Sequence, residues 1–376
     1  SDKDTVINYS VTGTAGSGSD FTALSGSVTI LAGTTSAVID VETIDNALLE
    51  DNETVIVTLT GTDDTDVTID TTPGANSAAV TIADDDKAAV SITANDASAA
   101  EPSDDGQFTV TLSAASDKDT VVSYSVAGTA DSGVDYSALA GSVTIQAGST
   151  SAVIDVATVD NAILEDNETV IATLTGTDDT DVTVDTAPGA STASVTIADD
   201  DTATVSITAT DASAAEPNDD GQFTVTMTTA SDKETVVYYA VTGTAGSGND
   251  YNVLSSSVTI LAGATTATID VSVLDESLLE DDETVTVTLT GITSGDADVS
   301  LGAAVTDTLT ISDNDTGQVT ITANDAGAAE PGTDGQFTVT LSTVSDTNTV
   351  ISYSVGGDAT AGSDYSALSG SVTILA

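Results

Sequence analysis

The chain repeats itself with a period of about 115 residues, and this period limits what it can fold into. The segment DNALLEDNETV at 45–55 returns as DNAILEDNETV at 160–170 and as DESLLEDDETV at 275–285. A second segment, AAEPSDDGQFTVTLS at 99–113, returns twice with small changes. Solenoid units are much shorter, about 20–50 residues, so this period predicts a row of whole domains.

Alignment of the copies divides the chain into two complete repeats and two partial ones. Residues 87–201 and 202–315 are complete, 1–86 lacks the first two strands, and 316–376 holds only the first strands. The linker is almost absent, because the triplet that closes one repeat runs directly into the first strand of the next. Neighbouring repeats are therefore expected to abut end to end.

Within each repeat, short runs alternate apolar residues with Thr or Ser. The second repeat has seven such runs, separated by Gly, Asp, Ser and Pro: 89–94, 107–113, 120–126, 141–147, 151–159, 169–175 and 193–198. Period-two alternation predicts strands with one apolar face, and two sheets packed through those faces make a seven-stranded antiparallel β-sandwich. Elsewhere, DNAILED at 160–166 suggests a helical turn, and 177–185 suggests a solvated loop.

The net charge of −57 excludes several classes of partner. With 61 acidic side chains, four lysines and no Arg or His, the chain lacks the cationic footprint that nucleic-acid binding needs. The same charge disfavours anionic membrane surfaces, and no apolar run approaches the roughly 18 residues of a membrane-spanning helix. The absence of Cys and His removes disulfides, thiol chemistry and the usual zinc and copper ligands.

Four acidic features recur along the repeats. They are a Glu before Pro, an Asp before an aromatic residue, a D-x4-E-x2-E cluster before a strand, and an acidic triplet at the end. In the first repeat they comprise Asp20, Asp45, Glu50, Glu53, Asp84, Asp85 and Asp86. In the second repeat they comprise Glu101, Asp135, Asp160, Glu165, Glu168, Asp199, Asp200 and Asp201. In the third and fourth they comprise Glu216, Asp250, Asp275, Glu280, Glu283, Asp313, Asp315, Glu330 and Asp364.

We expect these carboxylates to meet at one end of the sandwich, beside the next repeat, because loops two strands apart lie at the same end. So many carboxylates repel one another unless a cation lies among them, and Ca²⁺ accepts six to eight oxygen ligands. The alternative is a set of solvated acidic loops, but the return of the same spacing in each repeat favours a metal site. Paired carboxylates also occur in glycosidases. Few aromatic residues, and a site copied in every module, argue against an enzyme.

These motifs together resemble the Calx-β family, a domain of sodium/calcium exchangers, integrin β4 and many large bacterial surface proteins. The resemblance covers the whole chain and implies tandem Ig-like sandwiches, end to end, each with several Ca²⁺ ions held at the motif positions. It also implies the backbone carbonyl of Ile163 as a ligand in the second repeat. Two residues depart from the pattern and lower the local charge: Asn161, where exchanger domains often have a second Asp, and Asn314 inside a triplet.

Repetition and resemblance favour a calcium-rigidified stalk segment of a long bacterial adhesin or surface filament, located outside the cell or on its surface. The alternatives are an array that binds a glycan or a protein, and a Ca²⁺ sensor. Near-identical copies favour a stalk, because a sensor needs one or two tuned domains and a binding module needs exposed aromatic or cationic anchors. The expected partners are neighbouring repeats, other copies of the chain in a filament, and a cell-surface ligand that the sequence does not identify.

Overall fold

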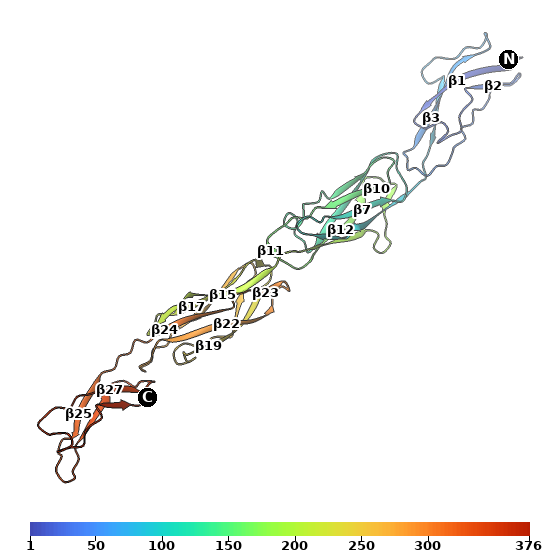
Figure 1. The fold of residues 1–376 in the computed structure, drawn as a ribbon. Helices are drawn as coiled ribbons and strands as arrows, with labels where there is room; N and C mark the ends of the chain where they lie inside the picture. Colours follow the sequence, from blue (N-terminus) through green and yellow to red (C-terminus); the bar gives the residue numbers. More distant parts are fainter. The chain divides into compact units, whose positions relative to one another are not determined.

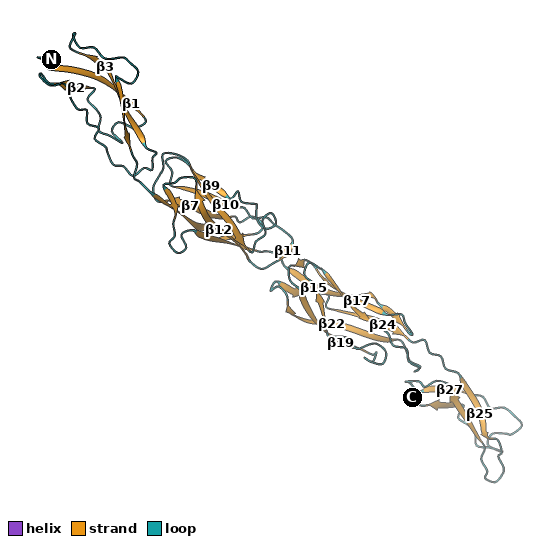
Figure 2. Cartoon of the chain, turned by 180° about the vertical axis from the view of Figure 1, so that it is seen from behind, coloured by secondary structure: helices purple, strands orange, loops and turns teal.

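A computed structural model describes all 376 residues, and it consists of strands and loops (Figures 1 and 2). This result confirms the predicted all-β fold. By their internal contacts, the residues form two compact units, Ser1–Asn161 with Asn167–Asp199 and Ala162–Asp166 with Asp200–Ala376. No helix has the length and apolarity that crossing a membrane requires.

The second repeat is a sandwich of two sheets inside the first unit. One sheet has the order β10-β7-β5-β13, and the other has the order β6-β14-β12-β8-β9. The strands of the first sheet are β5 (Ala88–Asp96), β7 (Gly106–Leu112), β10 (Ser151–Val156) and β13 (Val182–Val184). Those of the second are β6 (Ser98–Ala100), β8 (Thr120–Gly128), β9 (Ser142–Ile145), β12 (Glu168–Thr177) and β14 (Thr192–Ala198). All seven alternating runs of the sequence therefore form strands.

The third repeat has the same two sheets inside the second unit. Their orders are β21-β17-β15-β23 and β16-β24-β22-β19-β20. The strands are β15 (Ala203–Asp211), β16 (Ser213–Ala215), β17 (Gly221–Met227), β19 (Thr235–Gly243), β20 (Ser257–Ile260), β21 (Thr266–Val271), β22 (Glu283–Ser294), β23 (Val299–Leu301) and β24 (Thr306–Ser312). The repetition in sequence is thus also a repetition of topology.

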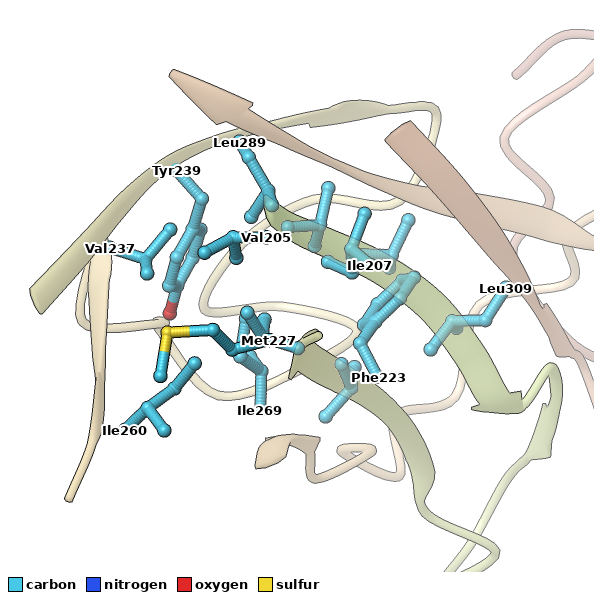
Figure 3. Close-up of a cluster of buried hydrophobic side chains, with 14 of the residues drawn as sticks. Val205, Ile207, Phe223, Met227, Val237, Tyr239, Ile260, Ile269, Leu289 and Leu309 are labelled. Atoms are coloured by element: carbon cyan, nitrogen blue, oxygen red, sulfur yellow. The ribbon is translucent and has the colours of Figure 1, made fainter. Parts of the chain in front are cut away.

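The core of each complete repeat lies between its two sheets. In the third repeat, Phe223 and Met227 of β17 meet Val237 and Tyr239 of β19 in one buried cluster (Figure 3). Every second residue of these strands points inward, so the alternation seen in the sequence places the apolar side chains here. Full burial of such a side chain stabilises the fold by about 1.5–3 kcal/mol.

Each complete repeat contains three short strands that the sequence pattern does not predict. Two of those in the second repeat lie in segments for which it predicts something else, a helical turn and a solvated loop. DNAILED forms no helical turn, because β11 (Ile163–Leu164) pairs in parallel with β18 (Ala230–Ser231). The segment 177–185 is not a solvated loop, because β13 pairs with β5, and both Val182 and Asp179 are buried. Partners distant in sequence fix these segments, so local periodicity carries no sign of them.

The two partial repeats each hold part of a sandwich. The first forms one sheet, β2-β1-β3-β4, from β1 (Thr5–Gly13), β2 (Ser27–Ile30), β3 (Glu53–Thr62) and β4 (Ser77–Ile82). The fourth forms two pairs, β25 (Val319–Asp325) with β26 (Gln336–Leu341) and β27 (Thr349–Ser352) with β28 (Ser371–Ile374). Residues 36–41 match β10 in sequence but form no strand, because the first repeat lacks the equivalent of its partner β7.

Candidate metal centre

A buried aromatic residue positions the aspartate that precedes it. Phe21 is buried in the first repeat, and Tyr251 is buried at the same position of the third. Asp20 is itself only 5% exposed, and its Oδ2 accepts the Gly16 amide at 2.5 Å. The Asp20 carbonyl accepts the Ile44 amide at 2.9 Å, which ties this turn to the start of the acidic D-x4-E-x2-E loop.

The acidic loop of the first repeat brings two glutamates to Asp20. Glu53 opens β3, where it pairs with Ile82, so the sheet itself fixes its position. The Glu50 amide donates to Oδ2 of Asp84 at 3.2 Å. One carboxylate oxygen from each of Asp20, Glu50 and Glu53 lies within 4.8 Å of the others. We call these three residues the first-repeat acidic group.

The remaining acidic residues predicted for the first repeat line the same hollow. A cavity of about 50 Å³ is bounded by the first-repeat acidic group and by Asp45, Asn46, Asp84, Asp85 and Asp86, among others. Its size suits one or a few small ions and excludes an organic ligand, which needs about 300–1,000 Å³. All seven carboxylates predicted there therefore surround one small, acidic space.

The electrostatics of this group show the cost of crowding carboxylates together. Burial, a hydrogen bond with Asp20 and nearby negative charges raise the pKa of Glu53 to about 7. Burial also acts to raise the pKa of Asp20, but hydrogen bonds from the Gly16 amide and from Glu53 hold that pKa below its ordinary value. In the absence of a cation, the pair thus shares a proton, which is how like charges in one place avoid full ionisation.

The third repeat contains an equivalent group and a second one. Asp250, Glu280 and Glu283 each place an oxygen within 4.8 Å of the other two. Burial, then the hydrogen bond and charge of Asp250, raise the pKa of Glu283 to about 7. The second group is formed by Glu216, Glu276, Asp313 and Asp315, again within 4.8 Å. Glu276 is absent from the sequence prediction, although it lies beside the predicted Asp275.

Several oxygen atoms of the second group are buried without any hydrogen-bond donor. They are Oε2 of Glu216, Oε1 of Glu276 and Oδ2 of Asp315. Burial, followed by the charges of Glu276 and Asp313, raises the pKa of Glu216 to about 7. A buried carboxylate oxygen without a partner costs free energy that a cation removes. An all-oxygen set of this kind fits Ca²⁺, which binds carboxylates in flexible geometry.

In the first two repeats, an asparagine takes the place of Glu276, and its side-chain amide donates hydrogen bonds to the neighbouring carboxylates. Asn46 Nδ2 donates to Asp20 at 3.4 Å and to Glu50 at 3.2 Å. Asn161 Nδ2 donates to Glu101 at 3.4 Å and to Asp135 at 3.2 Å. This asparagine therefore cross-links the carboxylates as well as lowering the local charge, which is the only effect that the sequence suggests.

The predicted ligands of the second repeat are divided between the two units. Glu101, Asp135, Asp160, Glu168 and Asp199 belong to the first unit, and Ile163, Glu165, Asp200 and Asp201 belong to the second. In the first unit, burial and the charges of Asp199, Asp135 and Asp160 raise the pKa of Glu101 to about 7. In the fourth repeat, no group of three carboxylates gathers around Glu330 or Asp364.

The acidic loop of the first repeat also holds the second repeat. Leu49 is buried in the hydrophobic core of the second repeat, although it directly precedes Glu50. Its amide donates to the Ala115 carbonyl at 3.0 Å, and its own carbonyl accepts the Asp117 amide at 3.0 Å. Leu279 makes the equivalent hydrogen bonds with Val344 and Asp346 inside the second unit. We call these leucines the docking leucines.

Lysines form ion pairs across this contact. Lys118 Nζ lies 2.8 Å from Asp51 of the acidic loop and 3.7 Å from Asp179, a buried residue of its own repeat. Lys233 spans Asp166 and Asp296 in the same way, at 2.5 and 3.5 Å. Three of the four lysines in the chain share this position in the repeat. Their recurrence, together with the leucine inside a polar loop, is the sequence signal that could have predicted the contact.

Comparison with known proteins places the whole chain in one family. The family model for the Calx-beta domain matches residues 1–86, 84–201, 198–315 and 312–374. Among curated proteins, none matches this chain.

Solved structures with similar folds include CBD12 from CALX1.2, which is 14% identical with a TM-score of 0.26, covering 59% of this chain and 99% of that one. The calcium-binding domain CBD12 of CALX1.1 is also 14% identical, with a TM-score of 0.26, covering 58% and 98%. Escherichia coli alpha-2-macroglobulin is 10% identical, with a TM-score of 0.20, covering 87% and 31%. At such scores these structures add no argument about function.

Proposed function

The chain belongs to the Calx-β family, and from this premise we propose that its repeats bind Ca²⁺ at the acidic groups. We propose further that the bound ions stiffen the row of repeats, which acts as a stalk segment of a bacterial adhesin or surface filament outside the cell. Calx-β domains are regulatory or binding modules. The proposal accordingly assigns no catalytic step to this chain.

One observation carries the calcium proposal. The second acidic group of the third repeat has three buried carboxylate oxygens that receive no hydrogen bond. A divalent cation supplies the positive charge that these oxygens lack, and Ca²⁺ takes oxygen ligands from Asp and Glu side chains. Glu216, Glu276, Asp313 and Asp315 would hold one ion, and Asp250, Glu280 and Glu283 would hold another.

The link between ion and stiffness rests on the docking leucines. Leu49 and Glu50 are neighbours in the chain, and Leu279 and Glu280 repeat that arrangement. An ion that fixes the glutamate also fixes the loop that carries the leucine into the next repeat. The expected partners are therefore the neighbouring repeats first, with other copies of the chain and a cell-surface ligand as further proposals.

Calcium dependence of stability tests the first half of the proposal. Thermal unfolding of residues 1–376 should shift to higher temperature with Ca²⁺. The free energy of unfolding should rise by about 2.7 kcal/mol for each site when free Ca²⁺ is 100 times its dissociation constant. Glu283→Gln should reduce this shift. The control Asp63→Asn lies in none of the acidic groups and should not reduce it. Unfolding curves that are identical with Ca²⁺ and with a chelator would remove calcium binding.

Small-angle scattering tests the second half. The stalk proposal expects the chain to become longer and less variable in shape as Ca²⁺ is added, without a change in mass. A compact particle whose dimensions do not change with Ca²⁺ would favour an array of ligand-binding modules. Stiffening that depends on only one or two of the repeats, with the others insensitive to Ca²⁺, would favour a sensor.

A further inference from the structure

The Ser-Asp-Lys segment of the second repeat fits the acidic loop of the first repeat residue by residue. Ser116 forms an isolated parallel bridge with Leu49, and Lys118 pairs with Asp51. Asp117 lies between these two contacts, and its amide donates to the Leu49 carbonyl at 3.0 Å. The backbone therefore places Asp117 beside the residue that follows Leu49, which is Glu50 of the first-repeat acidic group.

The Asp117 side chain is exposed and accepts no hydrogen bond, although its charge acts on the neighbouring Lys118. Asp119, two residues later, differs clearly, because its Oδ1 accepts the Ala147 amide at 2.9 Å. The ordinary reason for an aspartate in a strand-entry segment, a side-chain bond to the backbone, thus explains Asp119 and leaves Asp117 unexplained.

Asp117 faces other negative charges. Burial, the hydrogen bond with Asp20, and the charges of Asp20, Glu50 and Asp117 all raise the pKa of Glu53. The second unit repeats this arrangement: the Asp346 amide donates to the Leu279 carbonyl at 3.3 Å, and the Asp346 charge acts on both Glu280 and Glu283. Two joints thus set an aspartate of the later repeat against the acidic group of the earlier one.

Building on the proposed function, we infer that Asp117 and Asp346 are calcium ligands that the following repeat donates to the acidic group of the preceding repeat. Each such ion is then bound by two repeats at once. In the absence of Ca²⁺, the added aspartate repels the acidic loop and opposes the docking leucine. In its presence, the same aspartate is attracted, so binding of the ion and docking of the repeats become one coupled event.

Asp2 provides a matched control for a test. It occupies the same position in the first repeat as Asp117 does in the second, and no D-x4-E-x2-E loop stands before it in the 376 residues. Asp2→Asn therefore removes the same charge from the same motif without touching an acidic group. Glu50→Gln serves as the opposite control, because it alters the acidic group itself.

The chain has no cysteine, so a single pair of spin labels can report on this joint. Thr60 and Thr175 are exposed and occupy equivalent positions on β3 and β12, inside the first unit. In the chain carrying Thr60→Cys and Thr175→Cys, Ca²⁺ should narrow the distribution of distances between the labels. Asp117→Asn should shift the midpoint of this change to about tenfold higher Ca²⁺, and Asp2→Asn should not shift it.

The variants separate the two proposals. If Glu50→Gln shifts the midpoint and Asp117→Asn behaves as Asp2→Asn does, calcium binds the acidic group without help from the next repeat, and the inference is wrong. If Glu50→Gln has no effect either, the proposed calcium site itself is wrong. Asp346→Asn, followed by Ca²⁺ titration calorimetry of the whole chain, should weaken one class of sites by a similar factor. An unchanged isotherm would refute the second shared site.

Discussion

The third and fourth repeats contain the same hairpin in very different surroundings. In both, the first strand pairs with the QFTVT strand in the same register, with the same irregularity near its end. Phe223 of the third repeat is fully buried, whereas Phe337, its equivalent in the fourth, is 66% exposed. The hairpin therefore depends on local pairing, while burial depends on the opposite sheet, which residues 316–376 only begin to form.

The two partial repeats also differ in whether an acidic group forms. The first repeat lacks its first two strands yet gathers Asp20, Glu50 and Glu53, because one sheet and its loops position all three. Residues 316–376 contain the Glu-Pro and Asp-Tyr motifs of the fourth repeat without a D-x4-E-x2-E loop, and no group forms among them. The acidic loop is thus the element that assembles a site, and the other motifs contribute to it.

The largest expected difference between the two hairpins lies in the core. Phe223→Ala should destabilise the third repeat by about 3–5 kcal/mol, because it empties a packed site. Phe337→Ala should cost less than about 0.5 kcal/mol, because the side chain is largely in water already. Urea unfolding of the whole chain, monitored by hydrogen exchange in each repeat, measures both. Equal losses of stability in the two variants would show that Phe337 is packed in a hydrophobic core, contrary to its exposure in the structure.

The docking leucines offer a second, smaller contrast. Leu49 is 2% exposed against a complete repeat, whereas Leu279 is only partly buried against the incomplete fourth one. Leu49→Ala should therefore cost about 2–3 kcal/mol of stability, and Leu279→Ala about 1 kcal/mol. Differential scanning calorimetry of the two variants tests the order. A larger loss at Leu279 would mean that the core of the second repeat does not hold Leu49.

A third contrast concerns pH. The pKa values of Glu53, Glu216 and Glu283 are about 7, chiefly because of burial. The folded chain then binds protons more tightly than the unfolded chain does, so their contribution to stability is complete below about pH 4.5 and is lost as the pH rises through about 7. Calcium-free protein should melt at lower temperature at pH 8 than at pH 5.

Calcium should oppose this trend. The ion binds the deprotonated carboxylates, so its affinity should fall as the pH drops below about 7. Melting curves at several pH values, with and without Ca²⁺, should therefore diverge as the pH rises. The fourth repeat gathers no acidic group of its own, so outside its docking segment at 344–346 its hydrogen exchange should show little of this divergence. If calcium-free protein instead gains stability between pH 5 and pH 8, these glutamates do not share protons as the structure indicates.

Much of this architecture can be predicted from the sequence, because alternation and repetition are strong signals. The seven main strands follow from the alternation alone. The short strands β6, β11 and β13 do not, because each has only two or three residues and a partner distant in the chain. Ordinary alternation therefore identifies the sandwich but not the strand that joins one repeat to the next.

The same limit applies to the acidic groups. Their main members follow from the D-x4-E-x2-E spacing, since all four kinds of motif return together. Glu276 escapes prediction, because it replaces an asparagine and looks like a local change. Asp117 escapes because it belongs to another repeat, and only the docking of Leu49 brings it near. Sequence spacing reports the residues of one module well and the residues shared by two modules poorly.

The joint also bears on how such a chain can change its length. Each acidic loop carries a leucine for the next repeat, and the Ser-Asp-Lys sequence that receives this leucine at 116–118 and 231–233 also occurs at 1–3. Only Thr347 departs from this series, where a lysine would stand. Where these ends match, exchange between near-identical copies would add or remove whole modules and re-form the same leucine contact.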